Sequence, residues 1–264
     1  MSPMLQSLWN YRGFILGSVR REFESRYQKS VLGATWTIVN PLAMILVYTV
    51  IFSQIMKARL PGVDTQFAYS IYLCAGSLTW GLFTEIVSRG QGIFIENANL
   101  LKKINFPRLT LPVILVVSAC INFLIIFSLF LLFLTFSGNW PGWTLLNMVP
   151  LLVIQLLLAV GLAMVLGVLN VFFRDVGQFV GIFLQFWFWL TPIVYPLEIL
   201  PASVRGWMIL NPMFPLIRAY QNVLSGQSIA DWPALFIPVA MGGTLCLLGW
   251  RMFRTHSGDM VDEL

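Results

Sequence analysis

Charged residues are scarce in this sequence. Asp, Glu, Lys and Arg make up 10% of its 264 residues, whereas an ordinary soluble domain carries roughly 25%. The hydrophobic content of 58% and the mean hydropathy of +0.81 would hardly keep a domain of this size in solution. Disordered chains are excluded as well, because they contain few Leu, Ile, Val and Phe. The composition therefore indicates an integral membrane protein.

Residues that build catalytic and metal sites are also scarce. The three cysteines lie far apart in apolar runs without CxxC or Cys/His spacing, which favours a packing role. The only histidine is His256, and no acidic pair has catalytic spacing in or beside the apolar segments. The phosphate-binding pattern GxxxxGK(S/T) is absent. We therefore expect no enzyme activity, and a partner must supply the energy for any uphill transport.

Six apolar segments are candidates to cross a bilayer, which takes about 20 residues. None of them contains Asp, Glu, Lys, Arg or His, whereas an ion-coupled carrier usually keeps an ionisable group inside the membrane. A proton relay is therefore not expected. The predicted spans are residues 35–56, 68–84, 109–136, 145–173, 176–194 and 233–250.

The basic residues are unevenly divided between the two sides of these spans. Of sixteen Lys and Arg, only Lys57, Arg59, Arg205 and Arg218 lie on the side opposite the termini. Basic residues near span ends stay in the cytoplasm, so we predict that both termini are cytoplasmic.

Three shorter segments accompany the spans. The first 30 residues carry apolar residues at helical spacing, which predicts an amphipathic helix on the inner leaflet; an extended arm is the alternative. In the loop 96–108, Asn97 or Asn99 can cap a short amphipathic helix that ends at Pro107 and suits docking into a partner's groove; a plain connector is the alternative. Prolines divide residues 195–232 into pieces too short to cross, which predicts short helices at the outer interface.

Five motifs resemble, in order and spacing, the membrane (permease) subunit of bacterial ABC-type polysaccharide exporters, a family that includes the permeases for O-antigen, capsule and teichoic acid. They are RYQKSVLGATWTIVNP (26–41), NLLKKINFPRLTLP (99–112), FFRDVGQ (172–178), WLTPIVYP (189–196) and LNPMFPLI (210–217). The resemblance covers nearly the whole chain. It implies an all-α polytopic membrane protein in the bacterial inner membrane, with six transmembrane helices, an N-terminal interfacial helix, a cytoplasmic coupling helix and short periplasmic gate helices between spans five and six.

The resemblance also implies the partners and the function. A homodimer would pair with two separate ABC-type nucleotide-binding subunits, which bind ATP and Mg, so this chain itself has no cofactor. The coupling residues would be Asn99, Leu100, Leu101, Lys102, Lys103 and Ile104. The implied cargo is a lipid-linked polysaccharide, with O-antigen first and capsule or teichoic acid polymers as alternatives. An ion-coupled carrier and a non-transporting scaffold are the alternatives from other classes.

Candidate substrate contacts follow from the chemistry of a lipid-linked sugar polymer. Aromatic faces stack on sugar rings without trapping them, and lipid-facing packing is the alternative role for such residues. Arg26 and Lys29 could contact a phosphate of the carrier lipid, or could simply anchor the first span. We predict one domain over 1–264, with an interfacial helix at 1–30, a six-span bundle at 31–254 and a cytoplasmic tail at 255–264. The aromatic candidates are Tyr48, Phe52, Phe179, Phe183 and Trp187.

Overall fold

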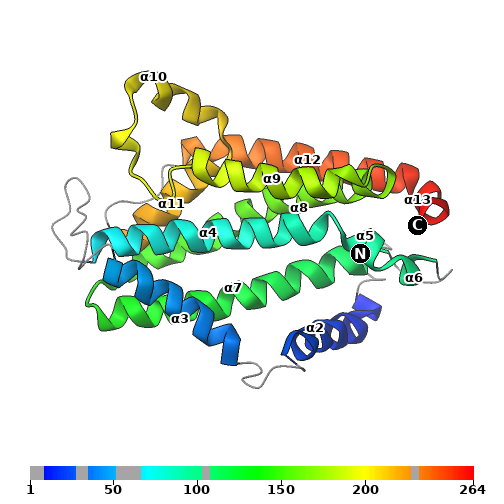
Figure 1. The fold of residues 1–264 in the computed structure, drawn as a ribbon, viewed down its shortest axis with the longest axis horizontal. Helices are drawn as coiled ribbons and strands as arrows, with labels where there is room; N and C mark the ends of the chain where they lie inside the picture. Colours follow the sequence, from blue (N-terminus) through cyan, green and yellow to red (C-terminus); the bar gives the residue numbers. More distant parts are fainter. Residues whose placement is uncertain (1–8, 28–34, 52–66, 103–107, 227–231) are drawn as a thin grey trace.

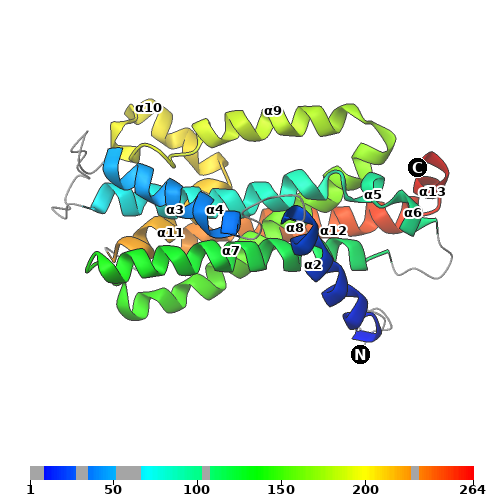
Figure 2. The ribbon, with the colours of Figure 1, turned by 60° about the horizontal axis from the view of Figure 1, so that its bottom comes forward.

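The computed structural model describes residues 9–27, 35–51, 67–102, 108–226 and 232–264, and within these ranges the chain is helical and has no strand (Figure 1). Long helices lie side by side along the long axis of the molecule (Figures 1 and 2). They are α4 (Ala68–Gly90), α7 (Thr110–Phe136), α8 (Met148–Phe172) and α12 (Phe236–His256); the 3-10 helices η3 (Gly142–Asn147) and η6 (Pro233–Leu235) precede α8 and α12.

Four helical stretches are long and apolar enough to cross a membrane: Ala68–Gly90, Thr110–Phe136, Gly142–Phe172 and Pro233–His256. Two other predicted spans correspond to the shorter helices α3 (Trp36–Tyr48) and α9 (Asp175–Leu190). At 1.5 Å per residue α9 extends about 24 Å, less than a hydrocarbon core of about 30 Å. Helix α3 continues as a π-helix to Ile51, where this described range ends. The all-α polytopic class is confirmed, whereas the count of six spans stays a prediction.

Helix α4 is the central helix of the bundle. It packs against α3, α7, α8 and α9, and 72% of its apolar window is buried, compared with 28% for α7 and 22% for α12. Its hydropathy is the lowest of the four because protein rather than lipid surrounds it, so small and polar residues are tolerated. The sequence analysis ended this span at Thr84, where charged residues follow. That boundary was wrong, since the helix continues to Gly90.

Glycine allows α4 and α8 to approach closely near the end of α4. A Cβ atom added at Gly90 would lie 2.5 Å from the Cβ of Ala163 on α8, and one added at Gly167 would lie 2.8 Å from the carbonyl oxygen of Gly90. Small residues at such crossings bring two backbones together in membrane proteins. This contact fixes the point from which the next, shorter helices start.

Short helices lie at both ends of the bundle (Figure 1). We call the end that carries α5 (Ile93–Glu96), α6 (Ala98–Leu101) and α13 (Asp259–Glu263) the inner end, following the predicted orientation. The outer end carries the segment between α9 and α12, whose predicted short helices are confirmed. They are η4 (Leu197–Ile199), α10 (Ala202–Arg205), η5 (Gly206–Leu210) and α11 (Met213–Ser225), and α11 packs inside the bundle against α4 and α8.

The N-terminal segment forms a helix, α2 (Arg12–Tyr27), which packs against α7. Ile15 and Val19 are buried, whereas Trp9 and Leu16 are exposed on other sides of the segment. In Figure 2 the helix leaves the side of the bundle obliquely. This arrangement confirms that the segment is helical and joins it to the bundle through Ile15 and Val19, whereas its place on the inner leaflet stays a prediction.

Candidate functional site

The predicted coupling helix is built as two short helices that follow α4 directly. Helix α5 ends where the Asn97 side-chain amide donates a hydrogen bond to the Ile93 carbonyl, 2.9 Å away. Asn97 is therefore the residue before α6, but its side chain closes α5 and does not cap α6. Of the predicted coupling residues, Lys103 and Ile104 lie outside the described residues. The inner end thus presents two successive turns of helix with a sharp break between them.

The side chains of α6 differ in what they offer to a partner. Asn99 and Lys102 are exposed, and Leu100 is half-buried. Leu101 is only 3% exposed and packs into the core of its own chain, so it supports α6 from within. The surface available for docking therefore centres on Asn99, Leu100 and Lys102.

A second inner-end element is bonded to the residues between α4 and α5. Asn170 on α8 donates a hydrogen bond to the Gln91 carbonyl (2.9 Å) and accepts one from the Gly177 backbone N–H (3.0 Å). Gln91 directly follows α4 and lies two residues before α5, and Gly177 lies in the first turn of α9. Through Asn170, the turn between α8 and α9, which lies within the FFRDVGQ motif, is therefore hydrogen-bonded to the residue that follows α4. We call α5 and α6, which come next, the coupling segment, after the role predicted for it.

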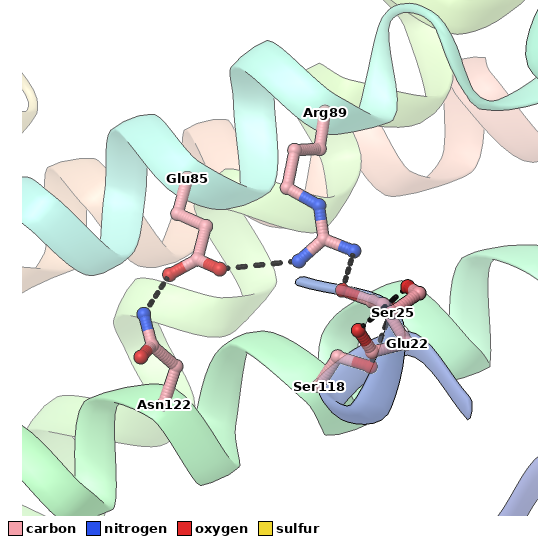
Figure 3. A network of polar contacts seen from close by, with 6 residues as sticks. All are labelled: Glu22, Ser25, Glu85, Arg89, Ser118 and Asn122. Atoms are coloured by element: carbon pink, nitrogen blue, oxygen red, sulfur yellow. Dashed lines mark hydrogen bonds and ion pairs between the residues drawn. The ribbon is translucent and has the colours of Figure 1, made fainter. Parts of the chain in front are cut away.

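Three charged side chains join α2 and α4 at the inner end (Figure 3). Arg89 on α4 donates to Glu22 of α2 over 2.5 Å and to Glu85, one turn back on α4, over 3.1 Å. The side chains are 29%, 23% and 17% exposed for Arg89, Glu22 and Glu85. Charge-assisted bonds of this kind are roughly twice as strong as neutral ones.

Polar side chains of α7 complete this network. Ser118 donates to the second oxygen of Glu22 (2.8 Å), and Asn122 donates to the second oxygen of Glu85 (2.8 Å), as Figure 3 shows. Asn122 lies about 18 Å along α7 from Thr110, well inside a stretch that can cross the membrane. We call Glu22, Glu85, Arg89, Ser118 and Asn122 the polar clamp. It joins α2, α4 and α7, and Arg89 lies four residues before α5.

The polar clamp corrects the expectation that the spans contain no ionisable residue. Glu85 and Arg89 lie inside the candidate span Ala68–Gly90. Sequence reasoning missed them because it treated charge as the end of a span, although the spacing of Glu85 and Arg89, four residues apart, is that of an intrahelical ion pair. The partner Glu22, 67 residues away in sequence, gave no signal.

The predicted aromatic residues of α9 fall into two environments. Phe179 and Phe183 are 64% and 44% exposed, and their rings stack with centroids 5.8 Å apart. Trp187 continues the row, 5.2 Å from Phe183, but is buried: its ring meets Phe83 edge-on and its indole N–H donates to Asn211. Tyr48 is half-buried at the end of α3, and Phe52 lies outside the described residues. Among the predicted aromatic residues that the structure describes, Phe179 and Phe183 are the two that are exposed in one subunit.

The two predicted phosphate contacts are placed only in part. Arg26 belongs to the last turn of α2, whose preceding turn carries Glu22 of the polar clamp. Lys29 lies outside the described residues.

Neutral hydrogen bonds hold the outer-end segment that follows α9. Tyr69 donates to the Val194 carbonyl (2.6 Å) and Tyr72 to the Pro192 carbonyl (3.1 Å), so two side chains of α4 bind the backbone of the WLTPIVYP motif. Asn211, in the LNPMFPLI motif, donates to the Thr191 hydroxyl (2.9 Å) and accepts from the Met213 N–H (3.1 Å) and from Trp187 (2.9 Å). We call these contacts the outer lock. The two motifs meet here through Thr191 and Asn211, which are 20 residues apart in sequence.

Comparison with known proteins gives one family. The ABC-2 type transporter family matches residues 15–224, a range that includes the polar clamp and the outer lock. The O-antigen export system permease protein RfbA of Myxococcus xanthus is 30% identical over 266 residues, covering 100% of each chain. RfbA of Klebsiella pneumoniae is 27% identical over 89% of this chain and 88% of its own. The polysialic acid transport protein KpsM of Escherichia coli is 20% identical over 91% and 92%.

Proposed function

Because the chain belongs to the ABC-2 type transporter family, we propose that it is the membrane-spanning subunit of an ATP-driven exporter that moves a lipid-linked polysaccharide out of the cytoplasm. The observation that carries this proposal is the full-length similarity to an O-antigen export permease. The helical architecture supports it, since four apolar stretches can cross a membrane and short helices lie at both ends of the bundle.

The proposed cargo is O-antigen. The relatives named for O-antigen export are 27–30% identical to this chain, whereas the relative named for polysialic acid transport is 20% identical. A capsule polymer is the second candidate cargo, on the strength of that weaker similarity. Loss of one surface polysaccharide on deletion of this chain, with the other retained, distinguishes the two.

The proposed energy source is a separate ATP-hydrolysing subunit, which would hold the ATP and Mg, docked at the inner end. Helix α6 offers Leu100 as an apolar anchor with Asn99 and Lys102 at its rim, and the α8–α9 turn lies next to it. Since the polar clamp begins four residues before α5, a displacement of α5 and α6 by the partner would reach α2 and α7 through Arg89. Both termini would lie on this cytoplasmic side of the bacterial inner membrane.

The proposed pathway lies between two copies of the subunit. Phe179 and Phe183 form an open stacked pair on α9, and α3 likewise exposes apolar side chains such as Leu42 and Leu46. A second copy would pack against the apolar side chains of α3, and the stacked rings of α9 would line the space between the two copies through which the sugars pass. Trp187 would not contact the sugars but would position α9 through its contacts with Phe83 of α4 and with Asn211.

The test is co-purification of the ATPase with the permease, combined with export. Leu100→Asp should lower ATPase recovery at least about tenfold and stop export, because truncation of a buried anchor costs about 2 to 4 kcal/mol. Lys102→Ala should be mild, since rim charges are worth less than about 1 kcal/mol. An inactive ATPase should also stop export.

Ile199→Asp is the matched control, because Ile199 is similarly apolar but lies exposed at the outer end. It should leave ATPase recovery unchanged. Normal recovery by Leu100→Asp would mean that the docking surface lies elsewhere, and export that persists with an inactive ATPase would refute the proposed function.

A further inference from the structure

A cavity of about 480 Å³ lies beside the polar clamp, between α2, the coupling segment and the start of α7. Phe14, Ser18, Arg21 and Ser25 form its wall on α2, at spacings that place them on one helical face. Figure 3 shows Glu22, Ser25 and Arg89, which are part of this wall. The volume is within the usual range of a small-molecule site.

Two oppositely charged residues of the cavity wall, Arg21 and Glu96, do not belong to the polar clamp. Glu22 and Arg89 bind each other, whereas Arg21 and Glu96 have no oppositely charged partner within the described part of the chain. Arg21 donates to the Ser18 hydroxyl (2.9 Å), and Glu96 lies across the cavity on α5. The cavity therefore presents a guanidinium and a carboxylate that form no ion pair within the described residues. The guanidinium of Arg21 also lies 5.9 Å from the centroid of the Phe14 ring, and the Ser25 hydroxyl donates to the Glu22 carbonyl, 2.9 Å away.

The floor of the cavity is apolar. It is formed by Ile93, Leu111, Ile114 and Leu115, together with Leu100, which is also the docking residue proposed above. Leu111, Ile114 and Leu115 lie in the first two turns of α7, a helix that can cross the membrane, so the floor leads from the charged rim toward the hydrocarbon level. A matching ligand needs a positive and a negative group at one end and apolar chains at the other.

We propose that this cavity binds one zwitterionic phospholipid of the phosphatidylethanolamine type. Its phosphate accepts hydrogen bonds from Arg21 and Ser18, and its ammonium group donates to Glu96. Its acyl chains begin at the apolar floor and leave past Ile114, which is half-buried, because Leu111 and Leu115 are only 3% and 5% exposed. An anionic lipid without an amine would leave the Glu96 carboxylate unpaired, so the pair of charges selects against it.

The position of this lipid gives it a role distinct from that of the cargo. Asn97 and Leu100 of the coupling segment and the Arg21 face of α2 line the same cavity, so the lipid fills the joint between them. The inference does not depend on which polymer is exported, because it concerns only the inner leaflet.

The experiment uses the permease in complex with its ATPase, delipidated in mild detergent and then exposed to phosphatidylethanolamine, phosphatidylcholine or phosphatidylglycerol. Native mass spectrometry should find one tightly held phosphatidylethanolamine per subunit, with phosphatidylglycerol at least about tenfold less retained. Arg21→Ala and Glu96→Gln should each lower phosphatidylethanolamine retention by about tenfold. Added phosphatidylethanolamine should also raise the thermal unfolding temperature of the wild-type complex and not that of the variants.

Arg20→Ala is the matched control, because Arg20 lies on the same helix but outside the cavity, paired with Glu24. It should keep full retention. Soluble glycerophosphoethanolamine should not displace the lipid, since it lacks the acyl chains that meet the apolar floor; displacement would overturn the assignment to a lipid. Equal retention of phosphatidylglycerol, retention unaffected by both substitutions, or lipid held by the free permease but excluded once the ATPase is bound would each overturn the proposal.

Discussion

The two ends of the bundle are held together by different chemistry. At the inner end, charged side chains pair with one another across α2 and α4, and α7 adds a hydroxyl and an amide. At the outer end, neutral side chains bind mainly backbone carbonyl and N–H groups of the segment after α9. One end is held by charged side chains that bind one another, and the other by neutral side chains that bind the backbone and, at Asn211, two further side chains.

This difference bears on how each end can move. Arg and Glu side chains have several rotatable bonds, so the helices of the polar clamp can shift relative to one another while Arg89 keeps both carboxylates. A bond to a backbone carbonyl, such as that of Val194, fixes the chain itself at one point. We infer that the inner end tolerates the displacement that an ATPase would impose, whereas the outer lock must open bond by bond.

The largest expected effect comes from removal of the shared cation at the inner end. Arg89→Ala leaves Glu22 and Glu85 without their common guanidinium in a partly buried site. Removal of one partner of a buried ion pair is strongly destabilising, so we expect a loss of about 3 kcal/mol. Thermal unfolding of the purified subunit in detergent measures it, and export should fall in parallel.

Two matched variants show whether unpaired charge causes this loss. The triple variant Arg89→Ala, Glu22→Gln, Glu85→Gln removes all three charges and should recover most of the stability. Arg20→Ala, which breaks the exposed pair with Glu24, should cause no measurable change. If the triple variant is as unstable as Arg89→Ala alone, charge pairing is not what holds the inner end.

The outer lock should respond less strongly. Asn211→Ala removes the acceptor of the Trp187 indole and the partner of Thr191, so we expect a loss of about 2 kcal/mol, with unpaired buried groups but no unpaired charge. Asn211→Asp keeps the acceptor for Trp187 but cannot donate to the Thr191 hydroxyl, which itself donates to the Trp187 carbonyl, so this variant should be destabilised as well. A loss in Asn211→Ala that exceeds the loss in Arg89→Ala would reverse the comparison between the two ends.

The sequence predicted the outline of both ends but not their contacts. Apolar length and proline positions were enough for the helical bundle, for α2 and for the short helices near Pro212, because these depend on local chain properties. The extent of α4 was not predictable in this way: its central position makes it the least apolar span, and Glu85 extends it because a partner on α7 satisfies the charge. The indole of Trp187 is hydrogen-bonded to Asn211, which lies between η5 and α11, and periodicity within α9 cannot reveal such a contact.

The smallest expected change in stability comes from a substitution midway between the two ends, where one neutral hydrogen bond joins α8 to α4. The Gln155 amide on α8 donates to the Thr79 carbonyl of α4 over 2.7 Å, while within the described residues its own oxygen has no hydrogen-bond partner. Gln155→Leu removes one neutral bond but also one unsatisfied buried acceptor, at similar volume, so we expect a change below about 1 kcal/mol. Gln155→Glu places a charge at the same point and should be clearly more destabilising. Thermal unfolding of the two variants in the same detergent separates the effect of the lost hydrogen bond from the effect of the added charge. A loss in Gln155→Leu equal to that in Asn211→Ala would mean that neutral hydrogen bonds stabilise the middle of the bundle as much as the outer lock.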